Sequence, residues 1–131
     1  MQTSGDQINR RVNVPEVGNN FVNFYYQSLR ENINQLYDTQ IIRNHTRIKY
    51  QNVEYKEGEL RQLFEQMGSQ LEFYGEEVIV MDSGARRADI LVNGNIMPKN
   101  GGSRMRFAQY FTIANNHDNW FIHNSLLSII Q

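Results

Sequence analysis

Apolar residues recur at a helical spacing over residues 17–36, VGNNFVNFYYQSLRENINQL. They follow one another at steps of three or four: Val17, Phe21, Tyr25, Leu29, Ile33 and Leu36. This spacing places them on one face of a helix, which Phe24 widens and whose first turn Pro15 suits. A face with several aromatic rings needs a broad apolar partner, and a twisted sheet offers one more readily than a second narrow helix. The pattern therefore predicts a long opening helix that packs on a sheet.

The period of the apolar residues changes after this helix. The pattern of residues 37–44 fits either a short helix or the start of a strand. From Thr46 onwards apolar residues alternate on either side of Gln51-Asn52, which predicts a short hairpin. Helical spacing returns after Glu57, with apolar residues at Leu60, Leu63, Phe64 and Met67. This spacing predicts a second helix that ends at Gly68-Ser69.

From residue 71 onwards, apolar segments alternate with turn-rich residues. The segments span residues 71–73, 78–81, 88–97, 104–114 and 120–130. Turns are predicted at Tyr74-Gly75 and Ser83-Gly84. The order of helix, hairpin, short helix and antiparallel meander predicts an α+β domain over residues 14–131, in which one sheet wraps the opening helix. Residues 1–13 are polar and aperiodic, and we expect them to form a flexible tail.

The amino-acid composition limits which kinds of molecule the chain is expected to bind. The 131 residues fit one domain, and a net charge of −1 with a pI near 6.3 gives no overall attraction to nucleic acid or anionic lipid. The lack of cysteine excludes disulfides and thiolate metal sites. No apolar run approaches the roughly 20 residues that a bilayer-spanning helix needs. We therefore expect an intracellular protein without membrane or direct nucleic-acid contacts.

Four stretches, in this order, resemble motifs of the nuclear transport factor 2 family. They are residues 17–26 (VGNNFVNFYY), 59–64 (ELRQLF), 94–95 with 104–113 (RMRFAQYFTI), and 120–124 (WFIHN). The resemblance implies a cone-like fold, in which a strongly curved antiparallel sheet wraps the long first helix and dimerises through its face. The opening motif is similar to that of the eukaryotic branch, whose members are non-enzymatic and bind Phe-rich peptides, Ran or export-receptor subunits.

Three types within this branch differ in their sites. The Ran carriers have a Trp-Glu pair and an acidic loop where this chain has Tyr50-Gln51 and residues 98–103 without a carboxylate, so Ran binding is not expected. The small accessory subunit of the messenger-RNA export receptor, which we favour, has a first helix similar to residues 21–26. The stress-granule scaffolds bind Phe-rich peptides through a first-helix Phe. That resemblance implies a peptide site at Phe21, Val17 and Phe24.

The last predicted strand departs from the family. Asn124 is followed by SLLSII, whereas the family ending carries an Asp and an Arg. Apolar residues in place of a charged pair favour an obligate partner, and ordinary core packing explains them equally well. The resemblance places the interface, with a homodimeric or heterodimeric partner, on the sheet face carrying Phe107, Gln109, Phe111, Trp120, Ile122, Leu127 and Ile129.

Few residues are candidates for catalysis: His45, His117, His123 and Asp89. Beyond the adjacent His117-Asp118, no histidine has a second ligand at a metal-binding spacing. Asp89 could act as a general base, although a surface role with Arg86 or Arg87 is commoner. We therefore predict no catalytic, metal or cofactor site.

Together these features predict a non-enzymatic, dimerising adaptor in nucleocytoplasmic transport. It would pair with a related export-receptor domain, contribute to binding Phe-Gly nucleoporins, and act in the nucleus, at the nuclear pore or in the cytoplasm. One alternative is a scaffold or structural subunit of a larger complex. Another is a small-molecule isomerase or dehydratase that uses a buried Asp89 or His123 in the cone.

Overall fold

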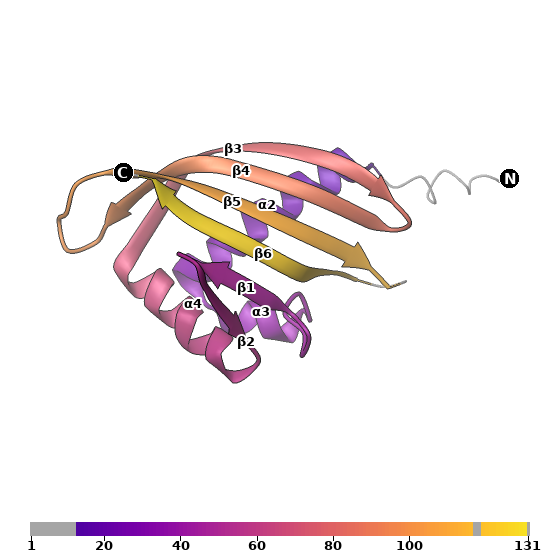
Figure 1. The fold of residues 1–131 in the computed structure, drawn as a ribbon, viewed down its shortest axis with the longest axis horizontal. Helices are drawn as coiled ribbons and strands as arrows, with labels where there is room; N and C mark the ends of the chain where they lie inside the picture. The colour runs from indigo at the N-terminus through magenta and orange to yellow at the C-terminus, as the bar shows by residue number, and fades with distance from the viewer. Residues whose placement is uncertain (1–12, 117–118, 131) are drawn as a thin grey trace, which may run out of the picture.

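A six-stranded curved sheet wraps helix α2 (Figure 1). The computed structural model describes residues 13–116 and 119–130. Of the predicted tail, residues 1–12 lie outside these ranges, and Asn13 caps the first helix. The elements are α2 (Val14–Glu31), α3 (Asn34–Asp38), β1 (Arg47–Tyr50), β2 (Val53–Lys56), α4 (Gly58–Gln70), β3 (Leu71–Gly84), β4 (Arg87–Pro98), β5 (Met105–Asn115) and β6 (Trp120–Ile130). The predicted α+β fold class is confirmed.

The opening helix is shorter than its apolar pattern predicts. It begins where the Asn13 side chain accepts a hydrogen bond from the Glu16 N–H at 3.1 Å, with Pro15 in the first turn. It ends at Glu31, and the following C-cap residue Asn32 has an extended backbone with φ −165°. The Asn32 side chain accepts the Asn34 N–H at 3.0 Å, a local bond that competes with helix continuation. The predicted single helix to Leu36 is therefore wrong, because this turn separates α2 from α3.

The predicted hairpin and second helix are confirmed, but the helix does not end at Gly68-Ser69 and continues to Gln70. Gln51 and Asn52 both have positive φ, 51° and 69°, as a tight two-residue hairpin turn requires. Helix α4 follows at once, and its buried residues are the four apolar ones at helical spacing: Leu60, Leu63, Phe64 and Met67.

Strand β3 runs unbroken through the predicted turn at Tyr74-Gly75. The register with β4 shifts between Tyr74 and Glu77, which marks a β-bulge, and Gly75 takes φ +66° there. A glycine inside a strand indicates a bulge as readily as a turn, and here the bulge is found. The predicted turn near Ser83-Gly84 is confirmed, with Ala85 and Arg86 at positive φ between β3 and β4.

The sheet order is β2-β1-β6-β5-β4-β3. Neighbouring strands are antiparallel except β1 and β6, which pair in parallel, with Ile48 opposite Ser125. No local feature of the sequence marks this pairing of distant strands. It attaches the hairpin to the border of the long meander, so the sheet is mixed.

The core lies between the inner face of the sheet and the helices. From α2 it includes Phe21, Val22, Tyr25, Tyr26 and Leu29, and from β4 and β5 Ile90, Val92, Phe107 and Phe111. Gly18 fits against β3, since a Cβ at this position would lie 2.5 Å from the Val80 Cγ2. Among the described residues, no helix has the length and apolar character to span a membrane.

Candidate functional site

The interior of the cone is lined by aromatic rings and by a hydrogen-bonded polar cluster. The Tyr26 hydroxyl donates to Gln109 Oε1 at 2.6 Å, and Gln109 Nε2 donates to Ser125 Oγ at 3.0 Å. Ser125 Oγ in turn donates to the Tyr110 carbonyl at 2.8 Å. Burial is the main cause that raises the pKa of both Tyr25 and Tyr26, so these phenols stay protonated and neutral at physiological pH. The cluster links α2 to two strands and presents no ionised group.

Most residues of the predicted partner interface belong to this interior. Five of them are at most 1% exposed: Phe107, Gln109, Phe111, Ile122 and Leu127. Trp120 and Ile129 are half-buried against the same core. Alternation identifies the residues that share a face, but it does not say which face meets the helix. The predicted interface residues are therefore corrected, because these side chains pack inside the chain. An interface on the outer face would use the residues that alternate with them along the strands.

The opposite face carries an apolar row across four strands. Cross-strand partners bring together Ile79, Leu91, Tyr110 and Leu126. Their side chains are 60%, 39%, 38% and 42% exposed. We call these four residues the outer row. Single exposed apolar residues are ordinary, but a contiguous row is a feature of interaction surfaces.

Asp89 lies beside the outer row, outside the interior. Its carboxylate accepts hydrogen bonds from Ser83, from the Tyr110 hydroxyl at 2.6 Å and from Thr112 Oγ1 at 3.1 Å. The Ser83 and Tyr110 bonds hold the pKa of Asp89 below its usual value, so it is ionised. The same hydrogen bond to Asp89 raises the pKa of Tyr110. An ionised, outward-facing carboxylate is not placed to act as a base inside the cone.

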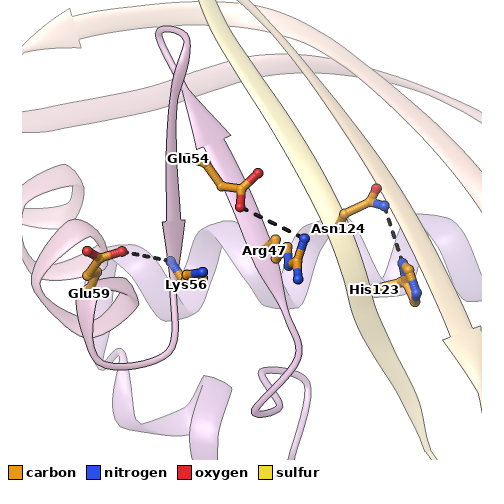
Figure 2. A network of polar contacts seen from close by, with 6 residues as sticks. All are labelled: Arg47, Glu54, Lys56, Glu59, His123 and Asn124. Atoms are coloured by element: carbon orange, nitrogen blue, oxygen red, sulfur yellow. Dashed lines mark hydrogen bonds and ion pairs between the residues drawn. The ribbon is translucent and has the colours of Figure 1, made fainter.

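The two borders of the sheet carry opposite charge. Strand β3 holds four acidic residues and no basic one: Glu72, Glu76, Glu77 and Asp82. Strands β1 and β2 hold Arg47, Lys49 and Lys56 against a single acid, Glu54. Arg47 lies 4.0 Å from Glu54, with both side chains well exposed, and the Lys56 N–H donates to Glu59 at 3.1 Å. Figure 2 shows both contacts. An exposed ion pair of this length adds little stability, so the basic border remains available to a partner.

Two of the candidate histidines lie together at the surface near the basic border. The ring centroids of His45 and His123 are 5.8 Å apart, and the His123 ring contacts the Asn124 amide at 3.2 Å (Figure 2). Burial, together with the charges of Arg87, His45 and Arg47, lowers the pKa of His123. His117 lies outside the described residues. Within residues 13–116 and 119–130, no group of three His, Asp or Glu side chains is arranged to hold a metal ion.

The predicted peptide-binding residues differ in exposure. Phe21 is 6% exposed, and its ring meets Phe111 edge-on at 5.3 Å between centroids. Val17 and Phe24 are half-buried and pack against the core from the helix surface. Phe21 is therefore a core residue whose ring has little surface to offer a ligand, whereas Val17 and Phe24 are partly exposed.

Comparisons with known proteins agree with this fold. The family model for the nuclear transport factor 2 (NTF2) domain matches residues 17–129. No curated protein sequence gives a significant match. Among solved structures, nuclear transport factor 2 from Cryptosporidium parvum superposes with a TM-score of 0.76 at 18% identity, over 88% of this chain and 94% of that one.

Two other solved structures share the fold. The yeast Ubp3-associated protein Bre5 matches with a TM-score of 0.70 at 16% identity, over 92% of this chain and 98% of Bre5. A ketosteroid isomerase-like protein from Erwinia carotovora atroseptica matches at 0.69 and 14% identity, over 92% of this chain and 99% of that one. At these identities the likeness establishes the fold alone.

Proposed function

Because the chain belongs to the nuclear transport factor 2 family, we propose that it is a non-enzymatic interaction domain that pairs with a second NTF2-like domain through the outer face of its sheet. The outer row carries this proposal. Its four side chains cross the middle of the face and leave substantial apolar surface in water. Covering that surface would stabilise an assembly by the hydrophobic effect.

The charge distribution supports a partner of the same kind. In a face-to-face pair with its two-fold axis along the strands, the β3 border of one domain lies over the hairpin border of the other. Acidic Glu72 and Glu77 would then face a border that carries Arg47 and Lys49. Unlike charges at the rim of an apolar interface favour association and fix its orientation.

Light scattering tests the pairing. We expect purified protein at tens of micromolar to have twice the mass of one chain, and Leu126→Glu to give a folded monomer because it places a charge inside the interface. Val53→Glu is the matched control, since Val53 is 53% exposed but lies away from the outer row. A stable monomer of the unaltered chain would overturn pairing between two copies of this chain and leave only pairing with a different NTF2-like domain, which affinity capture tests.

More specifically, we propose a role in nucleocytoplasmic transport, with an export-receptor domain of the same family as partner, at the nuclear pore and in the nucleus and cytoplasm. The support is the opening motif over residues 17–26 and the structural similarity to a nuclear transport factor 2. Affinity capture with mass spectrometry tests this role. We expect the unaltered chain, but not Leu126→Glu, to recover a protein that itself contains an NTF2-like domain.

Peptide binding is a separate part of the proposed role. A Phe-Gly repeat peptide would contact Val17 and Phe24, which α2 leaves partly exposed. Fluorescence anisotropy with a labelled Phe-Gly peptide should give saturable binding that Phe24→Ala weakens without unfolding the chain. Equal affinity of the unaltered chain and Phe24→Ala would remove these residues from the site.

A scaffold or structural subunit is the second candidate. The structural neighbour Bre5 was also solved as a cofactor in a complex with the yeast deubiquitinase Ubp3. This alternative uses the same outer face and differs in the partners that affinity capture would return. An isomerase-like role has less support, because Asp89 lies on the outer face of the sheet and the Tyr26–Gln109–Ser125 cluster inside carries no ionised group.

A further inference from the structure

Strand β3 forms one border of the sheet and has a free edge. It pairs with β4 alone, and no strand of the described part of the chain lies on its other side (Figure 1). After the bulge, Glu77 to Asp82 pair with Asn93 to Ala88 without interruption. A regular stretch of this length presents a row of main-chain N–H and C=O groups to which another extended chain can pair.

The side chains along this stretch suit strand pairing. The sequence of residues 78–81 is VIVM, which is rich in β-branched residues. Ile79 and Met81 are 60% and 63% exposed, while Val78 and Val80 pack towards the helix side. Alternate side chains of an added strand would therefore find apolar neighbours on both faces of the sheet.

The charges on β3 favour a basic partner chain. Its four carboxylates, with no Lys or Arg in the strand, include Glu76 and Glu77 at the bulge. One oxygen of Glu76, Oε2, is buried and accepts no hydrogen bond from any residue in the described ranges. A buried carboxylate oxygen without a donor is costly, and a cationic side chain that binds the Glu76 carboxylate from the strand edge would stabilise its negative charge.

We infer that the free edge of β3 binds an extended, basic segment of a protein partner, which joins the sheet as a further strand and places a Lys or Arg side chain against Glu76. A second copy of this chain is a poor occupant, because pairing β3 with β3 would bring two acidic strands together. This site shares Ile79 with the outer row but engages the chain differently, because strand addition uses the main chain at the edge, whereas the outer row uses side chains on the face.

Amide hydrogen exchange tests strand addition directly. The probe is the blocked peptide acetyl-KVKVKV-amide, added to the full chain and followed residue by residue with NMR. In the free protein the edge-facing amides between residues 77 and 82 should exchange quickly, since only alternate residues of β3 bond to β4. Bound peptide should slow those amides at least tenfold. Saturable binding with no change in their exchange would overturn strand addition.

Two matched comparisons separate main-chain pairing from simple charge attraction. A peptide of equal charge with Pro in place of the central Val lacks an N–H and should bind at least tenfold more weakly. On the protein, Glu76→Gln should weaken binding about tenfold, as expected for the loss of one charge-assisted bond, whereas Glu54→Gln at the opposite border should leave the affinity unchanged. Equal effects of the two substitutions would overturn the assignment to the β3 edge.

The monomeric Leu126→Glu variant keeps this test independent of pairing through the outer face. It should bind the basic peptide as tightly as the unaltered chain, because Leu126 lies on β6, away from β3. If Leu126→Glu abolishes both dimerisation and peptide binding, the peptide does not bind at the β3 edge alone and the inference fails. The proposed pairing through the outer row would still stand.

Discussion

Gln109 is the polar residue on which the packing of α2 against the sheet depends. It is fully buried, accepts the Tyr26 hydroxyl bond at 2.6 Å and donates to Ser125. Tyr26→Phe removes the donor and leaves a buried acceptor unpaired, so we expect the free energy of unfolding to fall by about 1–2 kcal/mol. Urea denaturation of both proteins measures this difference.

A double-mutant cycle provides the control for this prediction. Gln109→Leu removes the acceptor, so adding Tyr26→Phe to it should cost much less than Tyr26→Phe alone. Additive losses would show that the two side chains do not interact. The sequence analysis placed Gln109 on a sheet face, but its partners on α2 and β6 could not be predicted because they lie far away in the chain.

Phe21 has a larger structural role than the family resemblance implies. Its ring is buried against Phe111 and stacks with Tyr25 at 6.3 Å between centroids. Phe21→Ala should lower the free energy of unfolding by about 3–5 kcal/mol, as is usual for removing a buried ring. Denaturant unfolding tests this, with Phe24→Ala as the milder comparison. A loss below about 1 kcal/mol would indicate a ring that is free to meet a ligand.

His123 gives the protein a pH-dependent contribution to stability. Burial and nearby cations lower the pKa of His123 below its ordinary value of 6.5 in the folded state. As the pH falls through 6.5, the unfolded chain takes up this proton before the folded one does, so the contribution of His123 to stability is lost on acidification.

Comparison with His123→Asn isolates this effect from that of the carboxylates. The stability of the unaltered chain should fall more between pH 7.5 and pH 5.5 than that of the variant. NMR titration of Arg87→Gln should also show an increased pKa for His123, since one repelling charge is gone. Identical pH profiles for the two stability curves would contradict the assignment.

At the scale of elements, helix α4 is held close to α2 by a glycine. A Cβ on Gly68 would lie 2.3 Å from the main-chain oxygen of Leu29, and a backbone atom cannot move aside as a side chain can. Gly68→Ala should therefore lower the melting temperature, with a loss of about 1–3 kcal/mol. Gly58→Ala is the matched control in the same helix, because no atom lies within 4 Å of its added Cβ.

The elements themselves were largely predictable from periodicity, and the exceptions have local causes. The helix break at Asn32 and the bulge at Gly75 arise where a side-chain bond or a left-handed residue competes with the regular structure. The parallel pairing of β1 with β6 has no local signal. Alternation places Phe107, Gln109 and Phe111 of β5 on one face, but only the position of α2 decides that this face is inside.

Sites that depend on the whole molecule were the least predictable. The outer row is assembled from four strands by cross-strand register, so its members are never close in the sequence. The partners of Asp89 are likewise spread over β3 and β5. The family resemblance indicated that a sheet face was important. The structure supplied the residues that this face exposes.

Pairing through the outer row also predicts how the stability of the whole molecule depends on its concentration. If the folded chain dimerises and the unfolded chain does not, mass action raises the melting temperature as protein concentration increases. We expect a rise of several degrees between about 1 and 100 µM by calorimetry, and no rise for Leu126→Glu. Leu126 is 42% exposed, so the substitution should spare the fold of the monomer and remove only the concentration dependence. A concentration dependence that persists in Leu126→Glu would place the interface elsewhere on the chain.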